Sequence, residues 1–356
     1  MLKNNVSCQD IHALDFMLSP SIKHLGIKQG YQKSNKHQAV VHKSNRRRNS
    51  LCHSDFYEPY ASHPILQEHS YQIDLPYSDL VSHLKVDTII SDSLYGTVYL
   101  LRNPKSQQLS ILKRVSKQIP FVASTELHLL SRLKSHPFIV NFFGSFETNY
   151  HKYFWIEYLP GQDLFYQLNR PLSFDTIRLY AAEIACALNY IHQSGFVYCD
   201  LKPENILIAS DGHIKLIDFG LAKDIRKQKS LINNNKDIYG TPEYMSPEMI
   251  LRKEITPASD WWAFGILLYE MIFKRTPFYC TDPERILKKI TSRSIMVPNC
   301  HNRDAEDLIY ALTAKDPSKR LTFEKIKEHP FFSPIDFTKV MAKYYTPSYV
   351  PSKLNM

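Results

Sequence analysis

The feature that most constrains the fold is a pair of polar motifs on either side of a predicted hairpin. Residues 198–205 read Tyr-Cys-Asp-Leu-Lys-Pro-Glu-Asn, and residues 218–220 read Asp-Phe-Gly. Between them, strand-like residues 206–208 and 214–217 flank an Asp-Gly pair at 211–212, which favours a tight hairpin turn. Such a hairpin folds the chain back and brings the two motifs together. Two unrelated polar loops would explain either motif alone, but the combination at this spacing argues against that explanation.

The side chains in these motifs suit the handling of phosphate and metal. Phosphoryl transfer requires phosphates held in line, metal ions on their oxygens, and a group that orients the attacking hydroxyl. Carboxylate and amide oxygens are good ligands for magnesium, and a lysine is a good partner for phosphate. Asp200, Lys202, Asn205 and Asp218 together supply these groups.

With these motifs the sequence resembles the eukaryotic protein kinase family, over roughly residues 80–332. The resemblance implies a serine/threonine protein kinase that takes its phosphoryl group from ATP. In that role Asp200 positions or deprotonates the substrate hydroxyl, and Lys202 steadies the transferring phosphoryl group. Asn205 and Asp218 are then the residues that hold Mg²⁺.

The resemblance also implies an α+β fold in two lobes. A small β-rich N-lobe with one main helix is expected over residues 77–157, and a larger, mainly helical C-lobe over residues 158–332. Strand composition occurs over 86–90, 96–102, 109–115, 142–146 and 153–157, and helical spacing over 123–133. Further on, Ser173 is a candidate N-cap of a helix that ends before Gly195, and an apolar helix is predicted over 261–273.

A nucleotide site is implied in the first lobe. Lys113 resembles the lysine that contacts the α- and β-phosphates, and Glu126 on the next helix resembles its ion-pair partner. A surface lysine and a solvated glutamate are the plain alternative, and such residues usually contribute little. The other residues expected around ATP are the loop residues Ile90, Ser91, Asp92, Ser93, Leu94, Tyr95, Gly96, Thr97 and Val98, the gatekeeper Ile156, the hinge residues Glu157 and Leu159, and Asp163.

The phosphate loop departs from the family pattern. Only Gly96 remains of the three glycines that the family uses, and Ser91 and Ser93 replace the others. Glycine lets backbone approach phosphate closely and adopt unusual dihedral angles, and Asp92 adds a negative charge nearby. We therefore predict weaker ATP binding, not its loss. This departure is the main argument for the alternative function, a pseudokinase that serves as a binding or scaffolding module.

Two further departures concern control by phosphorylation. Cys199 replaces the arginine that, in the family, usually precedes the catalytic aspartate and pairs with a phosphate. Asp237 occupies the position of the phosphorylated threonine, three residues before Gly240. Because the cation and the hydroxyl are replaced together, we expect activity that does not depend on phosphorylation of this segment. Ser230 is another candidate for modification, without further support.

Other motif residues are expected to stabilise the fold. Glu248 lies in the run 240–248, which resembles the end of a kinase activation segment, and should pair with Arg320. Asp260 should brace the catalytic loop from the buried helix. Ser246 stands where alanine is usual.

Within the kinases, the sequence resembles the AGC group and, inside it, the cAMP-dependent kinases. Tyr198, the run Gly-Thr-Pro-Glu-Tyr from residue 240 and the run Asp-Trp-Trp-Ala from residue 260 carry this resemblance. That subgroup prefers substrates of the type Arg-Arg-x-Ser/Thr, and clustered carboxylates suit such arginines. The residues at the matching positions are Asp163, Glu204 and Glu270 for the arginines, and Ile238, Pro242 and Met245 for an apolar pocket after the acceptor.

The ends of the chain differ from the middle. Residues 1–76 are polar without periodicity and are expected to form a mostly disordered extension. Within them, residues 46–51 read Arg-Arg-Arg-Asn-Ser-Leu, a substrate-like run, so Ser50 is a candidate autophosphorylation site or the segment is an inhibitor. A nuclear-import signal, or no function, is an equal alternative for this run. Residues 333–356 resemble the start of an AGC tail and lack its hydrophobic motif.

Composition argues against several other classes of protein. The net charge of +9 is not accompanied by a recognisable nucleic-acid module, so no nucleic-acid partner is expected. The longest strongly apolar stretch, residues 261–269, is too short to span a bilayer, so no membrane association is expected. Six dispersed cysteines and the lack of a signal peptide indicate a cytoplasmic and/or nuclear protein. A cyclic-nucleotide-binding regulatory subunit is a further partner that the resemblance allows, and no residue pattern in the sequence itself indicates one.

Overall fold

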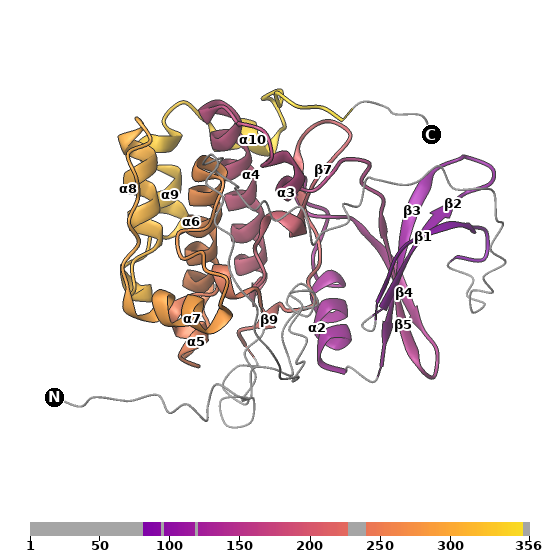
Figure 1. Cartoon of the computed structure of the whole chain (residues 1–356). Helices are drawn as coiled ribbons and strands as arrows, with labels where there is room; N and C mark the ends of the chain where they lie inside the picture. Colours follow the sequence, from indigo (N-terminus) through magenta and orange to yellow (C-terminus); the bar gives the residue numbers. More distant parts are fainter. Residues whose placement is uncertain (1–80, 94–95, 118–119, 227–239, 352–356) are drawn as a thin grey trace, which may run out of the picture.

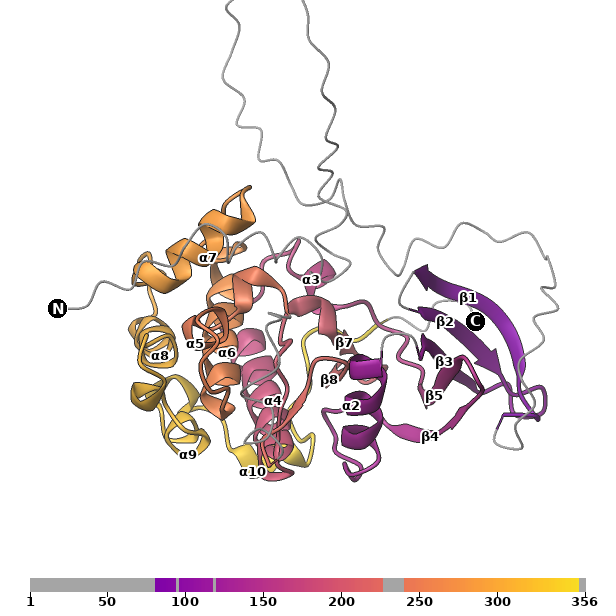
Figure 2. The same ribbon diagram turned by 90° about the horizontal axis from the view of Figure 1, so that it is seen from below.

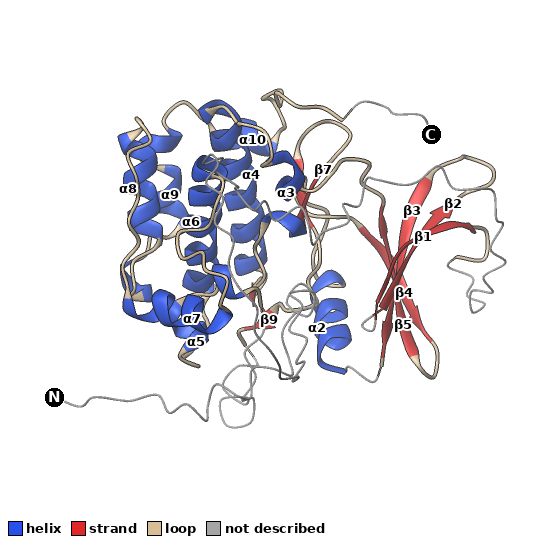
Figure 3. Ribbon diagram, in the orientation of Figure 1, coloured by secondary structure: helices blue, strands red, loops and turns tan. Residues whose placement is uncertain are grey.

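The computed structural model describes residues 81–93, 96–117, 120–226 and 240–351. Figure 1 shows these residues in two unequal parts, with a twisted sheet at one side and a larger group of helices at the other. Colouring by secondary structure separates the two parts clearly, because the five longer strands lie in the first part and most of the helices lie in the second (Figure 3). The predicted fold, two lobes of the α+β class, is confirmed.

The sheet of the smaller part has five antiparallel strands in the order β1-β2-β3-β5-β4. The strands are β1 (Lys85–Ser93), β2 (Gly96–Arg102), β3 (Leu109–Ser116), β4 (Phe142–Glu147) and β5 (His151–Glu157). Alternate residues of β2 are buried, as expected when side chains point to opposite faces of a sheet. The register pairs Val98 with Lys113 and Thr97 with Arg114. Lys113 and Arg114 therefore lie on opposite faces.

The helix of the smaller part, α2 (Pro120–Leu130), begins and ends three residues before the predicted range 123–133. Proline is favoured in the first turn of a helix because its missing N–H has no intrahelical partner there, which explains the earlier start. Figures 1 and 2 show α2 between the sheet and the helical part. This helix is thus placed to contact both parts.

The larger part is built around two central helices, α4 (Phe174–Gln193) and α6 (Pro257–Phe273). The Ser173 side chain accepts a hydrogen bond from the Thr176 N–H, so the predicted N-cap is confirmed. The surrounding elements are α3 (Leu164–Gln167), β6 (Phe196–Val197), η4 (Pro203–Asn205), β7 (Ile206–Ile208), β8 (Ile214–Leu216), β9 (Lys223–Asp224), η6 (Pro242–Tyr244), α5 (Pro247–Ile250), α7 (Pro283–Ser292), α8 (Arg303–Leu312), η7 (Pro317–Lys319), α9 (Phe323–Lys327), η8 (Pro330–Phe332) and α10 (Phe337–Met341).

The main hydrophobic core surrounds α4 and α6 and extends to the inner side of the smaller part. A second, smaller cluster includes Tyr99, Leu112 and Tyr153 of the sheet. The C-terminal residues pack on the larger part, where the Ser348 and Thr176 hydroxyls lie 2.7 Å apart. In the part of the chain that the structure describes, no helix combines the length and apolarity needed to cross a bilayer.

Candidate active site

The two parts of the chain meet at Lys113 of β3. Its Nζ lies 2.9 and 3.0 Å from the two carboxylate oxygens of Glu126 on α2, and 2.9 Å from Oδ1 of Asp218, which follows β8. Burial by itself would lower the pKa of Lys113, but the carboxylates of Asp218 and Glu126 raise it well above its ordinary value. Three distant segments thus converge on one ammonium group that stays charged.

The loop at residues 198–205 places its polar side chains in contact with one another. The Asn205 amide donates to the carbonyl oxygen of Asp200 at 2.9 Å and to its Oδ2 at 2.8 Å. Lys202 Nζ lies 3.1 Å from the same Oδ2 and donates to Thr241 Oγ1 at 3.0 Å. Burial raises the pKa of Asp200 above its ordinary value, and Lys202 partly offsets this. Asp200 is therefore a better proton acceptor than an exposed aspartate.

Asp260 of α6 holds the backbone of this loop. Its Oδ2 accepts from the Tyr198 N–H at 2.8 Å and lies 2.7 Å from His192 Nε2, and its Oδ1 accepts from the Cys199 N–H at 2.8 Å. Cys199 has a φ of 67°, in the left-handed region that residues other than glycine seldom adopt. The contacts to Asp260, which is 1% exposed, stabilise this conformation next to Asp200.

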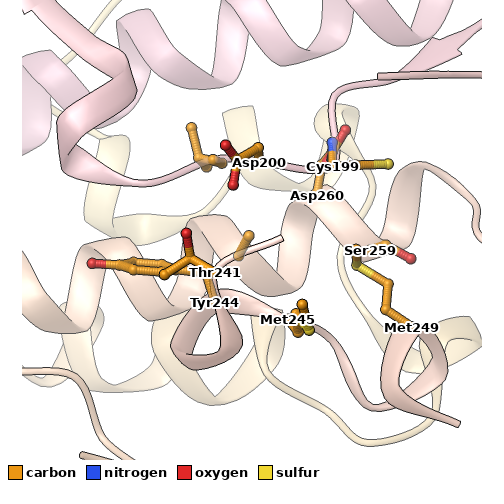
Figure 4. A pocket seen from close by; sticks show the side chains of 10 residues that line it. Cys199, Asp200, Thr241, Tyr244, Met245, Met249, Ser259 and Asp260 are labelled. Carbon is orange, nitrogen blue, oxygen red and sulfur yellow. The ribbon is translucent and has the colours of Figure 1, made fainter. Parts of the chain in front are cut away.

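Cys199 lines a small cavity beside the catalytic loop. The cavity has a volume of about 10 Å³, which is room for roughly one water molecule. In Figure 4 the sulfur of Cys199 points away from the carboxylate of Asp200. Val197, Met249 and Ile255 form an apolar cluster against which Cys199 packs, and burial raises the pKa of the thiol. The position at which the family usually has an arginine is therefore uncharged.

The phosphate loop is the hairpin between β1 and β2. Ser91 pairs with Val98, and Ser93 with Gly96, so the strands remain paired up to the last described residues. A Cβ atom on Gly96 would lie 2.1 Å from the carbonyl oxygen of Arg114, which explains why glycine is required at this position.

Asp92 of this loop has a side-chain hydrogen-bond partner on the neighbouring strand. Thr97 Oγ1 donates to Asp92 Oδ1 at 2.6 Å and accepts from Arg114 Nη2 at 2.5 Å. Because Arg114 and Lys113 are consecutive on β3, this chain of hydrogen bonds lies on the sheet face opposite Lys113. The Asp92 carboxylate and the Thr97 hydroxyl are thus directed away from the face where Lys113 would meet a nucleotide.

The two predicted hinge residues, Glu157 and Leu159, both have side-chain contacts within the chain. Glu157 Oε2 accepts from the backbone and side-chain N–H groups of Asn141, at 3.1 and 2.9 Å, and from Lys215 Nζ at 2.5 Å. One carboxylate oxygen of Glu157 and its backbone N–H, which donates to the Asn141 carbonyl oxygen at 2.9 Å, thus have partners within the chain. Leu159 is 7% exposed and belongs to the main core, with Ile156 packed beside it.

The three acids predicted to bind substrate are largely buried. Asp163 caps α3 by accepting from the Tyr166 N–H at 2.8 Å. Glu204 Oε2 is buried without a hydrogen-bond partner among the described residues, whereas Glu270 accepts from the Tyr244 hydroxyl. Burial raises the pKa of Glu204 to about 7, and Asp163 adds to this effect. Burial also raises the pKa of Glu270 to about 8, with a further contribution from Glu204. Lys202 lowers the pKa of Glu204 and Lys274 lowers that of Glu270, but neither offsets the effect of burial.

The other predicted residues are placed only in part. Pro242 is buried at the start of η6, and Met245 is buried and lines the cavity beside Asp200. The following predicted residues lie outside the described part of the chain: Ser50, Leu94, Tyr95, Ser230, Asp237 and Ile238.

The predicted structural pair of Glu248 and Arg320 is present. Arg320 Nη1 and Nη2 donate to the two carboxylate oxygens of Glu248 at 2.6 and 2.7 Å, and the Ser259 hydroxyl donates to one of them at 2.8 Å. By contrast, the hydroxyl of Ser246 is buried with no hydrogen-bond partner among the described residues.

Sequence reasoning missed several partners of the site. Neither the contact of Thr241 with Lys202 nor that of Tyr244 with Glu270 was expected. Both residues lie in the motif from residue 240, but their partners are distant in sequence, so no local pattern indicates the pairing.

Comparison with known proteins agrees with this geometry. The family model for the protein kinase domain matches residues 85–332. The chain is 37% identical over 278 residues to the serine/threonine-protein kinase YPK1 of Saccharomyces cerevisiae, covering 75% of this chain and 40% of that protein. It is 36% identical over 282 residues to the serine/threonine-protein kinase sgk-1 of Caenorhabditis elegans, covering 75% and 60%. For the serine/threonine-protein kinase Sgk1 of Gallus gallus the identity is 38% over 277 residues, covering 74% and 63%.

The chain therefore spans between 40% and 63% of the length of these three relatives. The matched region contains the convergence at Lys113, the loop at residues 198–205 and the buried acids. These observations together identify the chain as a member of the protein kinase domain family, in the AGC group of eukaryotic protein kinases.

Proposed function

We propose that this chain is an ATP-dependent serine/threonine protein kinase that acts on proteins with arginines before the acceptor residue. The observation that carries the proposal is the convergence of Lys113, Glu126 and Asp218 within hydrogen-bonding distance. The three relatives described above are named serine/threonine-protein kinases, which supports the same activity.

The residues around Lys113 fit a nucleotide with its metal. Members of the family use ATP and a divalent metal ion, and the bound nucleotide supplies the phosphoryl group. Asn205 donates through its amide nitrogen to Asp200, so its oxygen remains to meet the metal ion. Asp218 has a second carboxylate oxygen besides the one that contacts Lys113. An amide and a carboxylate oxygen are the ligands that Mg²⁺ prefers, so we assign both residues to Mg²⁺.

Asp200 and Lys202 are the groups placed to handle the acceptor hydroxyl. Asp200 is oriented by Asn205 and has a raised pKa, so it can align the hydroxyl and accept its proton. Lys202 lies beside Asp200 and next to Thr241, where a cation can stabilise charge on the transferring group.

The buried acids support a basic substrate. Glu204 Oε2 has no hydrogen-bond partner among the described residues, and the pKa values of Glu204 and Glu270 stay raised despite the positive charges of Lys202 and Lys274, so the site can accept a further positive charge. A guanidinium group of a substrate would supply that charge through paired hydrogen bonds. Asp163 lies near enough to influence Glu204, although its carboxylate already caps α3.

The alternative of a pseudokinase has no observation in its favour. The three relatives are all named as kinases, and the polar groups required for transfer contact one another. The altered phosphate loop, which motivated the alternative, is a paired hairpin as far as it is described.

A peptide assay with Mg²⁺ and ATP tests the proposal. The peptide Arg-Arg-Arg-Asn-Ser-Leu, taken from residues 46–51, should be phosphorylated, and a version with alanines for the arginines should be phosphorylated far less. Lys113→Met and Asp200→Ala should each abolish transfer, while the exposed control Glu324→Gln should not change it. Transfer that persists in Asp200→Ala would refute the assignment.

The same assay tests the modification of the chain itself. We propose that Ser50 is phosphorylated by the active protein, because it lies in this substrate-like run. Mass spectrometry after incubation with ATP should find phosphate on Ser50, and Ser50→Ala should lower autophosphorylation. An unchanged level in Ser50→Ala would contradict the proposal.

A further inference from the structure

The helix that carries Glu126 is anchored on two opposite sides. Residues two apart on an α-helix point about 200° away from each other. Glu126 therefore faces β3, where it contacts Lys113, and His128 faces the other way. The partner of His128 is Asp224 of β9, which lies beside α2 in Figure 1.

The contact of His128 belongs to a compact cluster. His128 Nε2 lies 3.0 Å from Asp224 Oδ2, and the His128 ring packs edge-on against Phe196 with the ring centroids 5.6 Å apart. The Asp224 carboxylate also accepts from Arg226 Nε at 2.9 Å and Nη2 at 3.1 Å, and the Arg226 guanidinium lies over Phe196. We call His128, Phe196, Asp224 and Arg226 the His128 clamp.

The clamp differs from an ordinary surface ion pair, which usually contributes little because water screens it. The side chain of Asp224 is only 8% exposed, and Phe196 is fully buried. The carboxylate accepts from both His128 and Arg226, so its orientation is determined by two side chains and the aromatic ring beneath them. A well-defined geometry of this kind can hold a helix in one position.

The clamp also connects the segments that carry the polar groups of the site. Asp224 pairs with Phe196 in the small sheet of β6 and β9. Strand β6 leads directly into the loop with Asp200, and β9 begins five residues after Asp218. Without the clamp, α2 would no longer be held against β9, and so would no longer be fixed in the position in which Glu126 contacts Lys113.

We propose that the His128 clamp positions α2 so that Glu126 reaches Lys113, and that no phosphorylated side chain is needed for this positioning. The sequence has Cys199 and Asp237 where the resemblance would place a cation and a phosphorylated threonine, and the clamp supplies a different connection between α2 and the segment after Asp218. His128 and Asp224 are thus positioning residues, which act on the reaction through Glu126. This inference rests on the proposed function.

The test compares His128→Ala and Asp224→Asn with the unchanged protein. Loss of the clamp lowers the fraction of molecules in which Glu126 contacts Lys113, so kcat should fall about tenfold or more, with a similar rise in KM for ATP. The KM for peptide should change little, because the acid cluster is untouched. His83→Ala, an exposed histidine of the same lobe, is the matched control and should behave like the unchanged protein.

Two further variants separate positioning from a general structural effect. His128→Gln retains a side-chain N–H donor and should restore most of the activity that His128→Ala loses. In a Glu126→Gln background, His128→Ala should have little further effect, because the residue through which it acts is already altered. The inference would be overturned if His128→Ala lowered activity by the same factor in the original protein and in the Glu126→Gln background. Unchanged kinetics in His128→Ala alone would also overturn it.

Nucleotide binding gives a readout that does not need turnover. The dissociation constant for a fluorescent ATP analogue with Mg²⁺ should rise several-fold in His128→Ala and stay unchanged in His83→Ala. If the protein without substitutions bound the analogue but transferred no phosphate, the proposed function would be refuted. Equal binding by His128→Ala and the unchanged protein would instead refute the clamp.

Discussion

Replacing Glu270 by glutamine is expected to stabilise the protein at alkaline pH and to weaken its binding of basic substrates. Burial raises the pKa of Glu270 from an ordinary value of 4.5 to about 8, so the folded state binds this proton more tightly than the unfolded state. The free energy of unfolding therefore falls as the pH rises between these values, because the unfolded chain gives up the proton first. Over the whole interval the loss amounts to about 4 to 5 kcal/mol.

Glutamine removes this loss and keeps the local contact. It is neutral at every pH, and its carbonyl oxygen can still accept from the Tyr244 hydroxyl. Glu270→Gln should thus raise the melting temperature at pH 8.5 by about 10 °C and change it little at pH 5, as measured by thermal denaturation. The exposed Glu324→Gln serves as the control and should show no such dependence on pH.

The same variant should lose affinity for arginine-containing peptides. At pH 8.5, where most of Glu270 is ionised, a hydrogen bond between charged groups contributes about 1.5 to 3 kcal/mol, so the KM for peptide should rise roughly 10- to 150-fold while the KM for ATP stays the same. A variant that is no more stable at pH 8.5 would show that Glu270 is ionised in the folded protein. An unchanged KM for peptide would show that Glu270 does not contact the arginines.

Three other predictions follow from single contacts. Arg320→Leu leaves the buried carboxylate of Glu248 without its charged partner and should reduce the free energy of unfolding by about 3 to 5 kcal/mol in urea titrations; a loss below about 1 kcal/mol would contradict this. Ser246→Ala removes a buried hydroxyl that has no partner and should stabilise the protein by about 1 kcal/mol without altering kinetics, whereas a lower melting temperature would count against it. Asp92→Ala removes the acceptor of the Thr97 hydroxyl and loosens the phosphate loop, so the KM for ATP should rise about fivefold. If Asp92 acted by repelling phosphate, the KM for ATP would fall instead.

Much of the fold was predictable because its signals are local. The strands of the small sheet follow from strand-forming residues between polar turns, and the helix after Ser173 follows from a capping residue and an apolar face. The start of α2 was displaced because Pro120, which permits an earlier first turn, lies before the apolar pattern. Local sequence patterns therefore predict that an element forms more accurately than they predict its first residue.

Contacts that depend on register or on long-range packing were not predictable. The side of the sheet to which Asp92 points is set by its pairing with Thr97 and by the position of Arg114 on a third strand. The use of Glu157 by Lys215 joins residues that are 58 positions apart. The raised pKa of Glu204 arises from burial, which a sequence motif does not report.

Helix α6 carries both the brace of the catalytic loop and an acid of the proposed arginine site. Asp260 and Glu270 are ten residues apart on this one buried helix, so their backbones are separated by about 15 Å along its axis. In the proposed function, the helix fixes the distance between the site of the acceptor hydroxyl and the site of the arginine that precedes it. The spacing between arginine and acceptor that a substrate may have is then set by the length of this helix. Changing surface loops alone should not alter that spacing.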